Sequence, residues 1–196
     1  MLTFSIAVFF LLITPGPGVL SAAGVGSAFG PKAGARYIAG LFIGTNLVAL
    51  AVVSGVAAVV LAQSEIRFAL LVASGSYLVY LAARIALSGS KIAFIEAASP
   101  PGIWGGIALQ AINPKAYAVN TALFTGFAFW PDSLLIETFL KFAIINAIWI
   151  PIHFLWLFAG VTLHRLDLPP KAHFRINVAM ALSMLAVVAL AAFAPK

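Results

Sequence analysis

Long apolar runs, separated by short polar links, dominate the pattern along the chain. A run of about 20 apolar residues can cross the roughly 30 Å of hydrocarbon in a bilayer. We expect every run to be a helix, because an open sheet leaves backbone groups without partners in lipid and the runs lack the alternation of barrel strands. The pattern predicts six spans, at Leu2–Ala23, Ile38–Ala62, Ile66–Leu87, Ile103–Phe129, Leu134–Leu163 and Phe174–Ala194.

Composition strengthens this interpretation. Of the 196 residues, 63% are hydrophobic and 8% are charged, whereas an ordinary soluble domain is about 25% charged. The sequence therefore predicts an all-α integral membrane protein with one transmembrane domain over residues 1–196. The absence of cysteine excludes disulfides and thiolate metal sites.

The basic residues predict an orientation rather than a nucleic-acid partner. No Lys or Arg precedes Lys32, so we interpret the first apolar run as a retained span and not as a signal peptide. The loops after the first, third and fifth spans, together with their flanks, carry seven basic residues: Lys32, Arg36, Arg84, Lys91, Arg165, Lys171 and Arg175. The other side carries three: Arg67, Lys141 and Lys196. The positive-inside rule then places both termini outside the cytoplasm, in a bacterial inner membrane.

Two spans are interrupted by proline at matching depths. "TPGPG" (Thr14–Gly18) interrupts the first span, and "INPKA" (Ile112–Ala116) interrupts the fourth. Pro15 and Pro114 lie half a chain apart, which predicts two inverted three-helix repeats over residues 1–99 and 100–196. Such paired interruptions indicate the midplane site of a transporter. The alternative is a pair of unrelated proline kinks.

The second interruption also contains a lysine. On insertion scales a lysine at bilayer depth costs roughly 2.5–3.5 kcal/mol, and Pro114 costs about 3 kcal/mol in a helix interior. Both become tolerable around a polar cavity. The half-helices that follow Pro17 and Pro114 would point their positive ends at a carboxylate, and Lys115 would add a full charge.

Four segments in order resemble a known family. They are "TPGPG", "GPKAGARYIAGLFIGTN" (Gly30–Asn46), "GSYLVYLAARIAL" (Gly75–Leu87) and "INPKA". Together they make the chain similar to the LysE/RhtB amino-acid exporters of the lysine exporter superfamily. The resemblance implies proton-driven export of amino acids. It assigns six residues to the transport core: Pro15, Gly16, Pro17, Asn113, Pro114 and Lys115.

One departure from the family bears on the substrate. Many relatives carry an acidic residue just after the glycine of the second span, but here Gly44 is followed by Thr45 and Asn46. A cationic substrate requires a carboxylate at mid-depth, and the sequence offers none. We therefore expect a small neutral, zwitterionic amino acid of the homoserine or threonine kind, with Asn46 among the residues that bind it.

The fourth span has a polar face. Its members recur at i, i+3, i+7, i+10 and i+11, on one side of a helix. They are Gln110, Asn113, Tyr117, Asn120 and Thr121. We expect this face to line the substrate path, and the alternative is hydrogen bonding between helices.

Two further groups of residues have alternative interpretations. His153 lies in the middle of the fifth span and can titrate near neutral pH, so it is a candidate to carry the coupling proton. Lys115 is the other candidate, and the alternative for His153 is a neutral side chain bonded to a neighbouring helix. Glu137 and Lys141, at i and i+4, predict a local ion pair, with a cation exit site as the alternative.

Other functions find less support. Ser74 and Ser76 lack a base motif, so we expect no enzyme activity, and we expect no cofactor and no metal. The expected partners are an amino acid, protons and the bilayer. The spacings Gly30-x-x-x-Gly34 and Gly40-x-x-x-Gly44 favour packing within the monomer, with a homodimer as an open alternative. A non-transporting membrane assembly factor or partner-binding subunit is the alternative function.

Overall fold

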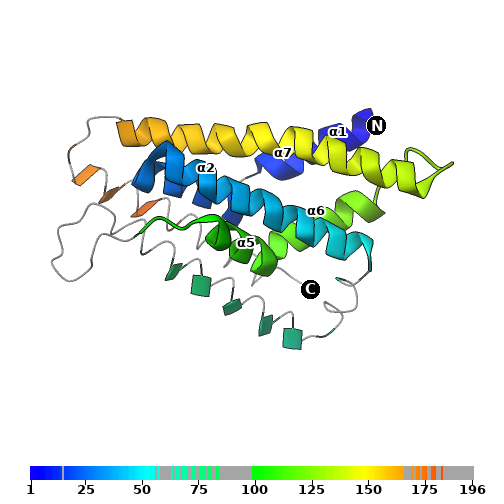
Figure 1. Ribbon diagram of the computed structural model, residues 1–196, viewed down its shortest axis with the longest axis horizontal. Helices are drawn as coiled ribbons and strands as arrows, with labels where there is room; N and C mark the ends of the chain where they lie inside the picture. The colour runs from blue at the N-terminus through cyan, green and yellow to red at the C-terminus, as the bar shows by residue number, and fades with distance from the viewer. Residues whose placement is uncertain are drawn as a thin grey trace.

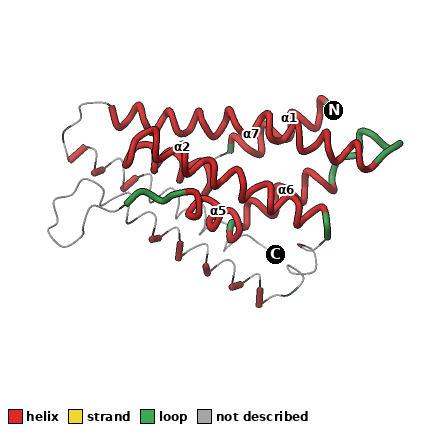
Figure 2. The backbone as a smooth tube through the Cα atoms, in the orientation of Figure 1, coloured by secondary structure: helices red, strands yellow, loops and turns green. Residues whose placement is uncertain are grey.

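The computed structural model describes residues 1–14, 16–55 and 99–165, with scattered residues between 57 and 83 and between 169 and 182. This part of the chain is helical and contains no strand, which confirms the all-α prediction (Figures 1 and 2). The predicted spans Ile66–Leu87 and Phe174–Ala194 lie largely outside the described residues. The helices are α1 (Leu2–Ile13), α2 (Pro17–Val53), α5 (Ile103–Ile112), α6 (Pro114–Thr125) and α7 (Leu134–Arg165).

Both predicted interruptions are confirmed. The helix that follows each break begins at a proline, at Pro17 in α2 and at Pro114 in α6. Proline suits a first helical position, because the N–H that it lacks would have no partner within the helix. At the second break Asn113 is extended (φ −79°, ψ 107°), and its side chain caps α6 by accepting a hydrogen bond from the backbone N–H of Lys115.

Helix α2 is longer than either span predicted in this region. The stretch between Ala23 and Ile38, predicted as a polar link, is helical. The helix is interrupted only at Gly30, whose φ of 80° and ψ of −178° are readily adopted by glycine alone. Pro31 then starts the second segment, and Lys32 is exposed just beyond it. The bend at Gly30 therefore brings Lys32 to the surface without a loop between two separate helices.

Helices α2 and α7 are long and apolar enough to cross a membrane. The apolar stretch Leu134–Thr162 of α7 has 29 residues, which rise roughly 43 Å as a helix. With 12 and 10 residues, α1 and α5 are too short to cross alone. Large apolar side chains are exposed on both long helices, including Leu47, Leu50, Leu155 and Phe158.

Glycines allow the helices to approach closely at two places. The second segment of α2 lies against α5, where a Cβ on Gly40 would overlap the carbonyl oxygen of Ile103. The first segment of α2 lies against the C-terminal half of α7, where a Cβ on Gly160 would overlap the carbonyl oxygen of Ala23. These two contacts hold α5 and α7 against opposite halves of the bent helix.

Two apolar clusters flank the middle of the bundle. The first joins α2, α5 and α7 and includes Tyr37, Leu41, Leu109, Trp149 and Leu157. The second joins α1, α6 and α7 and consists of Phe4, Val8, Val119, Leu123 and Ile145, with partly buried phenylalanines packed around it. The interrupted helices are thus fixed on both sides of their breaks.

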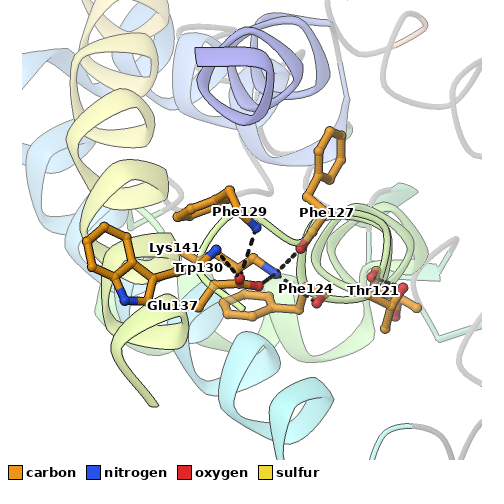
Figure 3. Close-up of polar contacts among 8 residues, drawn as sticks. Thr121, Phe124, Phe127, Phe129, Trp130, Glu137 and Lys141 are labelled. Carbon is orange, nitrogen blue, oxygen red and sulfur yellow. Dashed lines mark hydrogen bonds and ion pairs between the residues drawn. The ribbon is translucent and has the colours of Figure 1, made fainter. Parts of the chain in front are cut away.

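A buried ion pair stands at the start of α7. Glu137 Oε1 lies 2.8 Å from Lys141 Nζ. Its other oxygen, Oε2, accepts hydrogen bonds from the backbone N–H groups of Phe129 (2.9 Å) and Trp130 (2.7 Å), as Figure 3 shows. The carboxylate therefore holds the loop between α6 and α7 as well as its own helix, and the predicted local ion pair is confirmed.

Lys141 extends this ion pair to the end of α6. Its ammonium donates to the carbonyl oxygens of Phe124 (3.1 Å) and Phe127 (2.5 Å) (Figure 3). A cation at a helix C-terminus satisfies carbonyls that have no partner within the helix. Lys141 was counted above with the outer basic residues, but it is buried and serves as a cap on α6.

The glycine contacts can be tested with a matched pair of variants. Gly40→Ala should lower the free energy of unfolding by about 3 kcal/mol or prevent folding, because backbone on both helices would have to move. Gly102→Ala should change it by less than about 1 kcal/mol, since a Cβ there meets nothing within 4 Å. Thermal unfolding of the purified chain in detergent measures both. Equal tolerance of the two alanines would contradict this account of the packing.

Candidate functional site

The two helix breaks lie against each other. Lys115, in the first turn of α6, reaches across to the first break, where its Nζ donates a hydrogen bond of 2.6 Å to the carbonyl oxygen of Thr14. Its stem runs along Gly16, where a Cβ would lie 2.7 Å from Lys115 Cδ. We call this contact between Thr14, Gly16 and Lys115 the junction.

A small cavity opens beside the junction. Its volume is about 50 Å³, which exceeds the roughly 10–15 Å³ that one water molecule needs. The cavity lining includes Thr14 at the end of α1, Gly18 at the start of α2, Asn113 between α5 and α6, and His153 in α7.

Helix ends of both polarities meet at this cavity. The first amides of a helix and its last carbonyls have no partner within it, so N-terminal ends are electropositive and C-terminal ends electronegative. The α6 end is capped by Asn113, whose Nδ2 also donates to Gln110 Oε1 at 2.9 Å. The α2 end has Gly16 at its cap position and no side-chain cap. Gly18 and Val19 line the cavity in the first turn of α2.

His153 is buried at the side of the cavity. Its ring stacks on Trp149, with centroids 3.5 Å apart, and its Nδ1 lies 2.9 Å from the Trp149 carbonyl oxygen. A carbonyl only accepts hydrogen bonds, so we infer that Nδ1 carries the hydrogen of the neutral ring. Nε2 is then the nitrogen that can take a proton. It lies 3.5 Å from the position of a Cβ on Gly18, on the side of the cavity.

A pair of asparagines joins α2 to α7. Asn46 Nδ2 donates to Asn146 Oδ1 at 3.2 Å, and Asn146 Nδ2 donates back to Asn46 Oδ1 at 3.0 Å. Asn46 Nδ2 also lies 2.9 Å from the carbonyl oxygen of Phe42. The two asparagines are 100 residues apart, almost the spacing of the two breaks. We call them the amide pair.

The structure gathers part of the predicted site around the cavity. The predicted residues that line it are Gly16, Gln110, Asn113, Lys115, Asn120 and His153. Pro17 and Pro114 begin their helices without lining it, and Asn46 belongs to the amide pair. Tyr117 also lies outside the lining, and its hydroxyl donates to the carbonyl oxygen of Ala111 at the end of α5. Pro15 lies outside the described residues.

Several lining groups were not predicted. Thr14 contributes a backbone carbonyl, which no side-chain pattern reports. Thr45 and Trp149 line the cavity from helices whose inward faces were not assigned. Asn146 carried a usable signal, since its spacing from Asn46 nearly repeats the spacing of the prolines. That agreement could have predicted the amide pair.

The charge of the cavity lining sets what it can bind. Among the described residues that line the cavity, Lys115 is the one lysine or arginine, and no aspartate or glutamate is present. The described part of the chain also holds no group of three or more His, Cys, Asp and Glu residues that could bind a metal ion. With open amides at the start of α2, this arrangement suits a small anionic group.

The junction can be tested with a double-mutant cycle. Gly16→Ala should lower the free energy of unfolding by about 1–3 kcal/mol, because the new methyl displaces the Lys115 stem. In a Lys115→Ala background the same change should cost less than about 1 kcal/mol, since the stem is gone and the loss of glycine at a cap position remains. Gly16 has an extended φ of −164°, so backbone strain does not contribute. Equal costs in both backgrounds would contradict the contact.

The chain matches no family model, no curated protein and no solved structure. Its function is therefore inferred from the junction, the cavity and the motifs in its own sequence.

Proposed function

We propose that the chain exports small neutral, zwitterionic amino acids across the bacterial inner membrane, driven by the proton gradient. The observation that carries the proposal is the junction, where a lysine ammonium is held between two broken helices beside a cavity of about 50 Å³. Broken helices at membrane depth are tolerated where they surround a polar site. The resemblance of four ordered motifs to the LysE/RhtB exporters supports the same function.

The cavity offers complementary places for the two charges of an amino acid. The carboxylate would meet Lys115 Nζ and the amides of Gly18 and Val19, which have no partner within α2. The ammonium would meet the electronegative end of α5, as cations do at broken helices in transporters. No carboxylate lines the described cavity, so a second positive charge on the substrate would go unpaired. This favours neutral amino acids over basic ones.

The contacts also support two inverted repeats, residues 1–99 and 100–196, with three spans each. Helix α5 packs on the second segment of α2, and in the corresponding place α1 packs with α6 on α7. The amide pair joins positions 46 and 146, as expected for residues related by a two-fold axis. Rocking of these halves about the junction would expose the cavity to each side of the membrane in turn. In this arrangement both termini would lie outside the cytoplasm.

His153 is the group that we propose carries the coupling proton. Its Nδ1 is committed to the Trp149 carbonyl, so Nε2 can gain or lose a proton without breaking that hydrogen bond. Export driven by the proton gradient carries the substrate and the proton in opposite directions, so we propose that the bound substrate and the protonated ring of His153 occupy the site in turn.

Efflux from loaded cells tests the proposal. Cells fed single dipeptides accumulate one amino acid at a time, and its appearance in the medium is followed with and without the protein. One neutral amino acid should leave faster, and Lys115→Met should slow it about tenfold or more, because a charged hydrogen bond to the carboxylate is lost. Trp104→Phe, at an exposed position, is the matched control.

The same experiment separates the alternative function. If no amino acid leaves faster while the protein is folded in the membrane, the export proposal is wrong. A non-transporting assembly or partner-binding subunit would then be favoured, particularly if Lys115→Met raises stability.

The proton role of His153 has its own test in proteoliposomes. Export into an acidic medium should accelerate with the pH difference in the parent protein. His153→Gln should abolish that acceleration while exchange of labelled for unlabelled amino acid continues, since glutamine can still donate to Trp149 but cannot titrate. Retention of the pH acceleration in His153→Gln would move the proton role to another group, with Lys115 the first candidate.

A further inference from the structure

The C-terminal end of α1 contacts a positively charged side chain of the same protein. Lys115 Nζ donates to the carbonyl oxygen of Thr14 just beyond the last residue of α1. We infer that this end of α1 is a binding site for a monovalent cation, and that the ammonium of Lys115 is its tethered occupant. This inference does not depend on which substrate the chain carries.

The end of α1 needs a cation for electrostatic reasons. The last carbonyls of a helix have no donor within it and carry about half a negative charge between them. Both the N–H and the hydroxyl of Thr14 donate back to the Phe10 carbonyl (3.3 and 2.6 Å), so neither can serve the later carbonyls. The prolines of "TPGPG" supply no N–H group. That negative end favours a positive charge beside it.

Contacts at both ends of the Lys115 side chain direct it to the end of α1. Its backbone N–H is held by Asn113 Oδ1 at 3.1 Å, which fixes the root of the side chain. Gly16 leaves room for the stem, since a Cβ there would lie 2.7 Å from Lys115 Cδ and 3.0 Å from Lys115 Nζ. A glycine and a cap therefore hold the ammonium at the oxygen of Thr14.

The surroundings define what else could occupy the site. Leu11, Leu12 and Thr14 all line the cavity, so the last turn of α1 borders space that a small ion could enter. Broken-helix transporters bind Na⁺ at such carbonyl ends. A divalent ion would require anionic oxygen ligands, and the described lining has no carboxylate. The shared chemistry is a single positive charge bound by carbonyl oxygens, either as Na⁺ or as a primary ammonium group.

Removing the tethered charge should open the site to free ions. The parent protein, Lys115→Met and Lys115→Arg are purified as full chains in detergent. Their melting temperatures are measured against NaCl and against methylammonium chloride, with choline chloride keeping the ionic strength constant. Lys115→Met should gain about 3–6 °C at an ion concentration tenfold above its Kd, and the gain should saturate. The parent and Lys115→Arg should not respond.

The two salts distinguish the two chemistries. A response to Na⁺ identifies a site for a metal cation, and a response to methylammonium alone identifies a site for an ammonium group. If Lys115→Met responds to neither salt, or if the parent responds as strongly, the inference is wrong.

The test still gives an answer if Lys115→Met does not fold in choline chloride. Recovery of monodisperse Lys115→Met in Na⁺ or methylammonium, but not in choline, supports the site. Equal loss in all three salts, together with a Lys115→Gln variant whose melting temperature ignores the salts, overturns it. Because no readout involves transport, this result and the efflux result can fail separately.

Discussion

A helix that stops partway through a bundle leaves up to four carbonyl groups without partners within it. In this chain α1 stops at Ile13, and the group that meets its end is the ammonium of Lys115, from the first turn of another interrupted helix. Two features that would each be unfavourable alone are therefore satisfied by one contact. The geometry of the cavity follows, because the contact fixes how near the two breaks come to each other.

Small residues make that approach feasible. Gly16 leaves room for the lysine stem, and Gly18 leaves room beside the ring of His153. Farther out, Gly40 and Gly160 bring α5 and α7 against the backbone of α2. Close van der Waals packing of this kind is a main source of association for helices that lie in a membrane. The polar centre and its glycine frame are thus parts of the same packing.

The sequence predicted the centre of this arrangement better than its edges. Pro17, Asn113 and Lys115 are residue types with strong local effects, so the breaks and the charge could be placed from the pattern alone. Helical periodicity assigned both Tyr117 and Asn120 to the cavity. Asn120 lines it, whereas the Tyr117 hydroxyl donates to the carbonyl oxygen of Ala111 at the end of α5. The region around Gly30 was predicted to be a link because basic residues such as Lys32 and Arg36 are typical of loops. A backbone carbonyl such as that of Thr14 leaves no trace in a side-chain pattern.

The contacts that hold the breaks differ greatly in the length of chain that they close, and this sets an order of assembly. Glu137 and Lys141 bind partners 4 to 17 residues away, so the turn from α6 into α7 needs no other part of the chain to form. The junction and the amide pair close 101 and 100 residues. Contacts between residues so far apart can stabilise the fold only when both halves of the chain are in place. The cavity consequently cannot form until both halves of the chain are in place, and a chain that lacks its second half carries an α1 whose final carbonyls have yet to meet Lys115.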